Sequence, residues 1–591
     1  MLRLLFAFAG IGLFAACAGD TASEPDPAPR STLERSQAPV ELPLPLPNST
    51  TVAITAEDLA SRTAILADDA FEGRAPATPI GEKTADWIAA EYARLGLEPA
   101  GDDGTWFQTV AMVEQTLDET VSGLTFSGGE SGRDYEMELR EDAVIWTKRQ
   151  NATDFSFDDT ELVFVGYGIV APEFGWDDYA GLDATGKTVV MLINDPGFAT
   201  EDPDLFNGRA MTYYGRWTYK FEEAARHGAS AAIIVHETAP ASYGWDVVAN
   251  SWSGAQADLV RADGGESRIK MEGWIATDVA RKLFAEGGLD LEAMTIAAKR
   301  PGFAPVDMGG LMASGVISQS ITRSSSRNVV GVVSGTERPD EYVMFTAHWD
   351  HLGKKASERS GAPQQDFYRD EIYNGAVDNA TGVSAILDIA ETMAAAPAER
   401  SSLFAAVTLE ESGLLGSSYF VEYPLVPMNK IVAGFNIDAY QPVGPARDVT
   451  VIGYGASELE DRLAAVIAAD DRVLAPDSRP EAGLFYRSDQ APFVKEGVPM
   501  LYIKQGYDQM DGGIAVGKAA AEVHNAQRYH KPMDEVLPYF NFDGLEADAN
   551  AVFTVASDIA NSTDWPEWYD GNEFKAIREA SLVAGAEDAL D

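Results

Sequence analysis

Carboxylate and imidazole side chains follow apolar segments in the second half of the chain. In chain order, these residues are His348, Asp378, Glu410, Glu411, Asp438 and His530. The sequence predicts buried strands over 342–347, 402–409 and 430–437, and each ends directly before one or two of these residues. Open α/β sheets place their sites at the carboxyl ends of strands, so we expect the side chains to lie close together.

Each residue alone has an ordinary structural explanation. In a chain with 93 acidic residues, a Glu-Glu pair is usually solvated surface, and an aspartate before a helix is usually an N-cap. Gathered at one place without a basic neighbour, however, these groups would concentrate negative charge. That arrangement is costly unless a multivalent cation compensates it, so the pattern favours a metal site.

Two zinc ions fit the number and type of these groups. Zinc accepts imidazole and carboxylate ligands, and a two-metal site needs a bridging carboxylate plus two further ligands for each ion. Five residues suffice as metal ligands: His348, Asp378, Glu411, Asp438 and His530. Glu410 is then free to act as the base that takes a proton from the attacking water. Asp350 lies two residues past His348 and is expected to accept its imidazole N–H.

The elements that must position these residues are strands alternating with helices. Segment 382–393 has apolar residues at helical spacing directly after Asp378, and 448–453 and 498–504 predict further strands. This alternation predicts an α/β fold with a large sheet covered on both faces. Segment 120–315 combines short β-branched runs with a helical stretch, which indicates a smaller α/β module inserted into the chain.

Five ordered motifs resemble those of the co-catalytic zinc aminopeptidases. AHWDHLG, YNGAVDNATG, TLEESGLLGS, FNIDAY and YHKPMDE are similar to the motif set of the twenty-eighth metallopeptidase family, which includes glutamate carboxypeptidase-like enzymes. The resemblance covers residues 325–545 and implies a mixed-sheet zinc exopeptidase (phosphorylase/hydrolase-like) domain. Segment 120–315 looks like the protease-associated domain often inserted there. The peptidase domain would then consist of 51–119 and 316–591.

The resemblance also implies roles for individual residues. His348 and Asp438 would bind one zinc ion, and Glu411 and His530 would bind the other. Asp378 would bridge the two ions, and its peptide bond to Asn379 would be cis. Glu410 would be the general base, and Tyr529 would help to stabilise the tetrahedral intermediate. Arg487-Ser488-Asp489 resembles a substrate-pocket motif. His351 is assigned to packing or to support of the ligands.

The resemblance implies an enzyme that hydrolyses N-terminal residues from peptides. Other activities of the same site, and a non-catalytic function, are the alternatives. A carboxypeptidase or dipeptidase could use the same site. A glutaminyl cyclase-like acyl transfer uses one zinc, and the full set of five ligands argues against it. From another class, a non-catalytic binding lipoprotein would resemble the transferrin receptor ectodomain, but no ligand position is visibly replaced here.

The net charge limits which partners the protein can bind, and the N-terminal segment indicates its cellular location. With 44 basic and 93 acidic residues among 591, the net charge is −49, so nucleic-acid binding is not expected. Residues 1–17 resemble a lipoprotein signal peptide ending at Cys17, the only cysteine, and 18–50 read as a Pro/Ser-rich tether. We therefore expect an exported protein with a lipid anchor in a bacterial cell envelope, or alternatively a secreted one.

Overall fold

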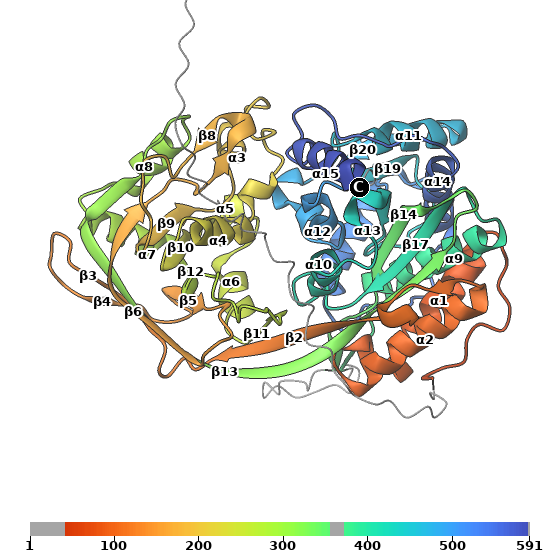
Figure 1. Ribbon diagram of the computed structural model, residues 1–591, viewed down its shortest axis with the longest axis horizontal. Coiled ribbons are helices and arrows are strands. Elements are labelled where there is room, and N and C mark those ends of the chain that lie inside the picture. The colour runs from red at the N-terminus through yellow and green to blue at the C-terminus, as the bar shows by residue number, and fades with distance from the viewer. Residues whose placement is uncertain (1–41, 355–370, 589–591) are drawn as a thin grey trace, which may run out of the picture. The chain divides into compact units, whose positions relative to one another are not determined.

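The computed structural model describes residues 42–354 and 371–588, which fold into a mixed α/β structure (Figure 1). The predicted α/β class is thereby confirmed. The predicted signal peptide and all but the last residues of the predicted tether lie outside the described residues, as does most of the charged segment between His348 and Asp378. Within the described part, no helix is both long and apolar enough to cross a membrane.

Three parallel strands form the centre of the main sheet. They are β14 (Arg338–His348), β17 (Arg400–Val407) and β18 (Ile431–Asn436), and β14 pairs with both of the others. The register places His348 opposite Val407, and Thr346 opposite Asn436. The three strands therefore end at one edge, which is where the candidate residues begin.

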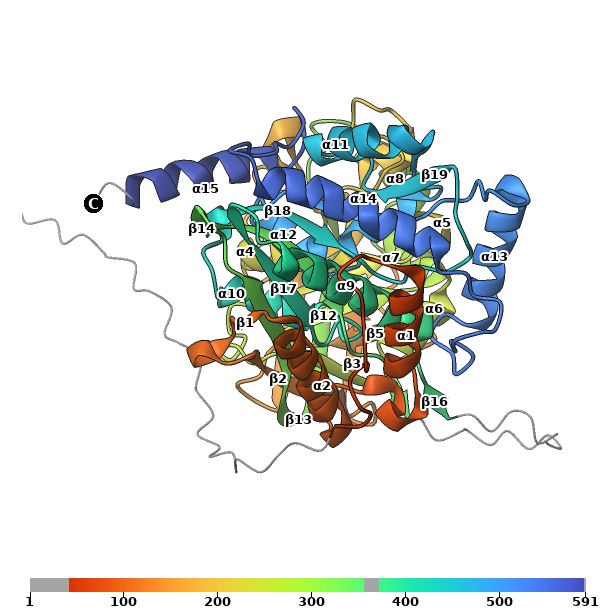
Figure 2. The ribbon, with the colours of Figure 1, turned by 90° about the vertical axis from the view of Figure 1, so that its right-hand side faces the viewer.

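Helices cover both faces of this sheet, as the continuous apolar runs in its strands predict. On one face lie α1 (Ala56–Leu66), α2 (Pro79–Leu95), α9 (Thr381–Ala395) and α14 (Asp543–Ala560), shown in Figure 2. They pack on Phe345 and Phe404. On the other face, Phe420 of α10 (Leu415–Glu422) and Phe493 of α12 (Gln490–Lys495) pack on Met344 and Leu403.

We call the two predicted parts of the peptidase domain, 51–119 and 316–591, the peptidase-like region. The segment between them forms its own sheet. Strands β9 (Thr188–Leu192), β10 (Ala231–Val235) and β12 (Met271–Ile275) are parallel, with β10 between the other two. Helix α4 (Trp217–Arg226) precedes β10, where the sequence predicts a helix. We call this α/β segment, residues 123–316, the inserted module; its assignment as a protease-associated domain stays a prediction.

Two long strands connect the inserted module to the main sheet. Strand β13 (Val306–Val333) pairs through its first half with β3 (Gly123–Ser127) and β6 (Asp154–Phe164) of the inserted module. Its second half pairs with β2 (Phe107–Leu117) and then with β17. The chain thus passes between the two sheets within one continuous strand, and the predicted domain boundary stays a prediction.

Candidate metal centre

All six candidate residues come together at the carboxyl edge of the main sheet. His348 is the last residue of β14, Glu410 and Glu411 follow β17, and Asp438 follows β18. Asp378 lies immediately before α9, and its peptide bond to Asn379 is cis. His530 follows α13 (Gly513–Gln527), a helix that we did not predict from the sequence.

The carboxylate of Asp378 lies between two imidazoles. Its Oδ1 is 3.2 Å from His348 Nε2, and its Oδ2 is 3.4 Å from His530 Nε2. Each oxygen therefore faces a different histidine, which is the arrangement a bridging carboxylate needs. Asp378 is only 4% exposed, so these contacts lie away from bulk water.

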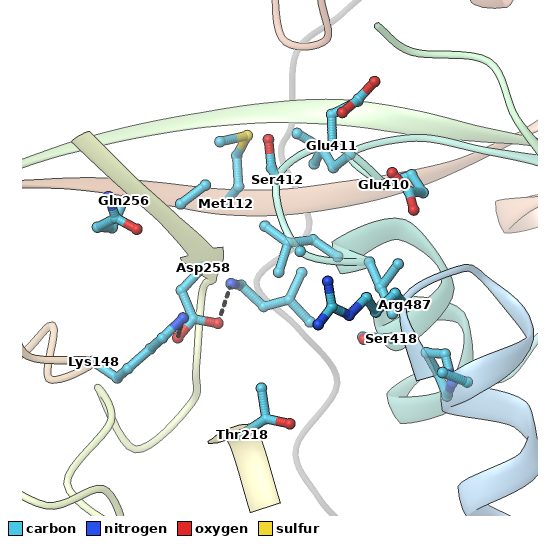
Figure 3. A pocket seen from close by; sticks show the side chains of 18 of the residues that line it. Met112, Lys148, Thr218, Gln256, Asp258, Glu410, Glu411, Ser412, Ser418 and Arg487 are labelled. Atoms are coloured by element: carbon cyan, nitrogen blue, oxygen red, sulfur yellow. Dashed lines mark hydrogen bonds and ion pairs between the residues drawn. The ribbon is translucent and has the colours of Figure 1, made fainter. Parts of the chain in front are cut away.

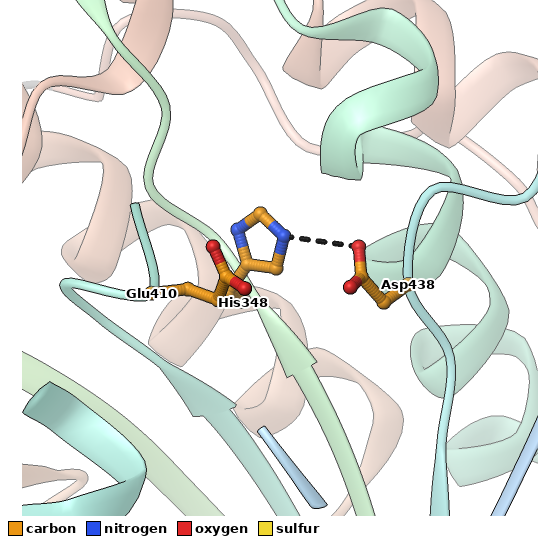
Figure 4. Close-up of side chains that lie close together, drawn as sticks. All are labelled: His348, Glu410 and Asp438. Carbon is orange, nitrogen blue, oxygen red and sulfur yellow. Dashed lines mark hydrogen bonds and ion pairs between the residues drawn. The ribbon is translucent and has the colours of Figure 1, made fainter. Parts of the chain in front are cut away.

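Two further carboxylates complete two groups of donors. Oδ1 of Asp438 is 3.2 Å from His348 Nε2, and Oε2 of Glu411 is 3.0 Å from His530 Nε2. Glu410 belongs to the His348 side, where its carboxylate and that of Asp438 flank the imidazole (Figure 4). The ligand atoms of His348, Glu410 and Asp438 all lie within 4.8 Å of one another.

His351 is closer to the candidate ligands than its expected packing role requires. Its Nδ1 is 2.5 Å from Glu411 Oε1, and it forms a second compact group with Asp378 and Glu411. Glu411 thus contacts His351 through one oxygen and His530 through the other. Since His351 is buried and His530 is 38% exposed at its side chain, His351 fixes the orientation of Glu411 from the interior.

Asp350 contacts His348 through its backbone and not, as predicted, through its carboxylate. The group that faces His348 Nδ1 is the backbone carbonyl of Asp350, at 3.1 Å, whereas its carboxylate is 4.0 Å away. The carboxylate instead accepts the backbone N–H of Glu410 at 3.2 Å. The strand ends before Asp350, so the alternation that would align its side chain with His348 does not continue. Asp350 therefore positions Glu410 as well as the imidazole.

The electrostatics of this cluster fit a bound cation. Burial raises the pKa of Glu410 well above its ordinary value, and burial raises that of Asp350 to about 7. Burial also opposes ionisation of Asp378, but hydrogen bonds with His348 and His530 outweigh it and hold the pKa well below its usual range. Among the described residues, no lysine or arginine forms an ion pair with these carboxylates. Imidazole and carboxylate donors without a basic partner are the chemistry of a zinc site.

Three residues that we did not assign from the sequence hold the ligand loops in place. The buried guanidinium of Arg74 donates to the carbonyls of Trp349, Asn374 and Gly375 at 2.6–2.9 Å. The side chain of Asn379 bonds the carbonyl of Ile437 at 3.0 Å and the N–H of Ala439 at 3.1 Å, which ties the Asp378 loop to the Asp438 loop.

Asp534 is the third of these supporting residues. Its carboxylate accepts the backbone N–H of Val377 and of Asp378, at 3.0–3.2 Å. Asp534 lies in the motif YHKPMDE, which carried a signal for it, whereas Arg74 lies outside the five motifs.

The donor cluster opens into a cavity of about 1290 Å³ (Figure 3). Glu410, Glu411, Tyr529 and His530 line it on the peptidase-like side, and the inserted module lines the other. The ring of Tyr529 stacks on His530 with centroids 3.9 Å apart. Of the Arg487-Ser488-Asp489 motif, only Arg487 reaches the cavity, because Asp489 is buried and bonds Ser417 at 2.7 Å.

Two relatives are similar to part of this chain. Aminopeptidase NAALADL1 of Mus musculus is 29% identical over 149 residues, which cover 23% of this chain and 17% of the relative. Aminopeptidase YwaD of Bacillus subtilis (strain 168) is 28% identical over 123 residues, covering 20% of this chain and 23% of the relative. The chain thus matches less than a quarter of the length of either relative.

A solved structure and a family model complete the comparison. The structure of an aminopeptidase from Aneurinibacillus sp. strain AM-1 aligns over 87% of this chain and 95% of its own, at 17% identity and a TM-score of 0.46. The model of Peptidase family M28 matches residues 328–559, the segment that contains all six candidate residues. Residues 328–559 of this chain are therefore similar to peptidase family M28.

Proposed function

We propose that this protein is a zinc-dependent exopeptidase that removes N-terminal residues from peptides. The observation that carries the proposal is the buried carboxylate of Asp378 between His348 and His530, with Glu410 beside it. His348 and Asp438 would hold one zinc ion, Glu411 and His530 a second, and Asp378 both. The relatives named above as aminopeptidases support the same activity.

The side chains suggest how a peptide bond is hydrolysed. When bound, the zinc ions supply Lewis acidity for the scissile carbonyl and lower the pKa of the attacking water. Glu410, whose pKa is raised by burial, accepts the proton of that water and delivers it to the leaving amine. The Glu410 backbone is fixed by Asp350, so the carboxylate keeps its position during the transfer. Tyr529 lies at the cavity wall, where its hydroxyl can donate to the developing oxyanion.

The charge of the site favours aminopeptidase over carboxypeptidase action at the cleaved bond. Glu410 and Glu411 line the cavity, Asp378 and Asp438 lie beside the imidazole of His348, and a free α-amino group is positively charged at neutral pH. A peptide would therefore place its N-terminus, rather than its C-terminal carboxylate, beside the donor cluster. The inserted module walls the cavity, and we propose that it restricts access to peptides and flexible chain ends.

We further propose that the protein is exported and anchored through a lipid on Cys17. Support comes from the sequence alone, namely the apolar run after Arg3 and the small residues before Cys17. This location would give the enzyme access to peptides in the cell envelope.

Removal of metal should abolish the activity reversibly. We expect dialysis against EDTA to reduce the hydrolysis of aminoacyl-p-nitroanilides by more than about 100-fold, because zinc supplies the Lewis acid of the reaction. Adding zinc back should restore the rate, with recovery complete near two zinc ions per chain. A panel of aminoacyl, N-blocked and C-blocked substrates checks the direction of attack. Turnover that is absent on every peptide would favour the binding-lipoprotein alternative, whereas turnover that is unchanged by EDTA would contradict a zinc-dependent mechanism.

A further inference from the structure

Strand β11 (Ala255–Leu259) of the inserted module is an edge strand. It pairs with β2 in antiparallel register, and no other strand of the described residues pairs with it. All five residues of β11 line the cavity into which the donor cluster opens. Figure 3 shows Gln256 and Asp258 of this strand in the same cavity as Glu410. The unpaired edge of β11 is therefore a candidate binding surface for a molecule that enters this cavity.

The hydrogen-bond pattern between β11 and β2 determines which backbone groups face the unpaired edge. The N–H of Val260, directly after β11, bonds the carbonyl of Ala111 at 3.0 Å. Hydrogen-bonded pairs alternate along an antiparallel ladder, so the even-numbered residues of β11 bond β2 and the odd-numbered ones do not. The N–H and C=O groups of Ala255 and Ala257 therefore point away from β2.

Side chains close this edge at one end of β11 and leave the rest of it open. At Leu259 the outward N–H bonds Asp258 Oδ1 at 2.8 Å, and the outward carbonyl accepts Gln150 Nε2 at 2.6 Å. No residue that the structure describes bonds the outward groups of Ala255 or Ala257. Unpaired backbone groups on a strand edge are a template for an added strand, and proteins usually cover them. An open stretch inside this cavity therefore indicates a binding edge.

The direction of β11 determines how a peptide lies on this edge. Ala255 is exposed, whereas Leu259 is buried in one apolar cluster with Leu409, the residue before Glu410. The strand therefore runs toward the donor cluster. A peptide that pairs with β11 in the antiparallel direction has its N-terminus at the Leu259 end, which is the end nearer to the metal centre. This direction agrees with the removal of N-terminal residues.

We propose that the open edge of β11 binds the peptide substrate as an added antiparallel strand. Ala257 and Ala255 each form a hydrogen-bonded pair with one residue of the peptide, and these two peptide residues lie two positions apart. Because only backbone groups take part, the edge accepts extended peptides irrespective of their side chains. This inference rests on the proposed exopeptidase function. It gives the inserted module a direct part in binding the segment of substrate that follows the cleaved bond.

Peptide length tests whether the substrate reaches this edge. The series consists of neutral peptide amides of two to ten residues, which share the same first two residues and span up to about 33 Å when extended. We expect kcat/KM of the zinc-loaded enzyme to rise about 10-fold or more from the dipeptide to the decapeptide, because only longer peptides reach Ala257 and Ala255. The variant Ala257→Pro should remove most of this gain, since proline lacks the N–H and its ring occupies the open edge.

Ala152→Pro is the matched control and should keep the gain of the parent enzyme. Ala152 is exposed on the inserted module and does not line the cavity, and no described residue bonds its N–H. Proline is tolerated on an edge strand where the N–H faces away from the sheet, and melting temperatures check that Ala257→Pro folds. Equal kcat/KM on all lengths, or an unchanged gain in folded Ala257→Pro, overturns the binding edge and leaves the peptidase function intact.

Binding without turnover keeps the two failures distinguishable. The decapeptide, labelled with a fluorophore at its C-terminus, is titrated into EDTA-treated protein and followed by fluorescence anisotropy. Single N-methyl groups on its backbone should weaken binding about 10-fold at two positions that lie two residues apart, and less than about 3-fold at the neighbouring positions. If no peptide is cleaved but this alternation is observed, the proposed peptidase function fails and the binding edge stands. Equal binding of all N-methylated peptides, or no binding of the parent peptide, overturns the binding edge.

Discussion

Glu410→Gln lowers kcat on aminoacyl-p-nitroanilides by about 10²–10⁴-fold while the zinc content stays unchanged. The magnitude is that of a general base in other enzymes, and it corresponds to about 3–5 kcal/mol of transition-state free energy. Glutamine keeps the size of the side chain but cannot accept the proton. Because Glu410 is not among the five residues assigned as ligands, the ions should remain bound.

Steady-state kinetics and elemental analysis of the same preparation check this expectation. Glu266→Gln is the control, since Glu266 is exposed on the inserted module and lies outside the cavity. If Glu410→Gln loses zinc together with activity, Glu410 is a ligand, as its place within 4.8 Å of His348 and Asp438 also permits. If activity stays within a few-fold of the parent enzyme, the assignment as base is wrong.

The Asp378→Asn variant should bind at least one zinc ion fewer than the parent protein and should lose its activity. The neutral amide cannot supply an anionic oxygen to each of two cations. Loss of an outer-shell partner alone weakens zinc binding by about 10–100-fold, so loss of a shared ligand should weaken it by at least about 100-fold. We expect the zinc content to fall below two per chain and kcat/KM to fall by more than about 100-fold.

Equilibrium dialysis against buffered zinc measures this change, with the exposed Asp278→Asn as control. A near-ultraviolet circular dichroism spectrum shows whether the variant remains folded. Retention of two tightly bound ions in a folded Asp378→Asn protein would contradict a bridging role for this carboxylate.

The sequence predicted the edge of the sheet that carries the site, because local patterns determine where strands end. Apolar runs that stop at His348, Glu410 and Asp438 belong to parallel neighbours, so their ends had to meet. Asp378 precedes a predicted helix and His530 follows the last predicted strand, so their residue types made them candidate ligands, and the resemblance implied which zinc ion each would bind. The bond between Asp378 and Asn379, expected to be cis from the same resemblance, is cis in the structure.

Other parts of the site depend on contacts between distant segments, which no local pattern reveals. Arg74 reaches the carbonyl of Asn374 across 300 residues of chain, and Asp534 bonds the backbone of Asp378 across 156. The contact of His351 with Glu411 depends on how the chain turns after β14, where the strand alternation ends.

The most direct test of the account is to locate the metal in crystals of the zinc-loaded protein. Anomalous diffraction at the zinc absorption edge should show two peaks, roughly 3.5–4 Å apart, with the carboxylate of Asp378 between them. His348 and Asp438 should flank one peak, and Glu411 and His530 the other. A single peak, or zinc bound elsewhere on this acidic chain, would contradict the two-metal centre on which the proposed hydrolysis depends.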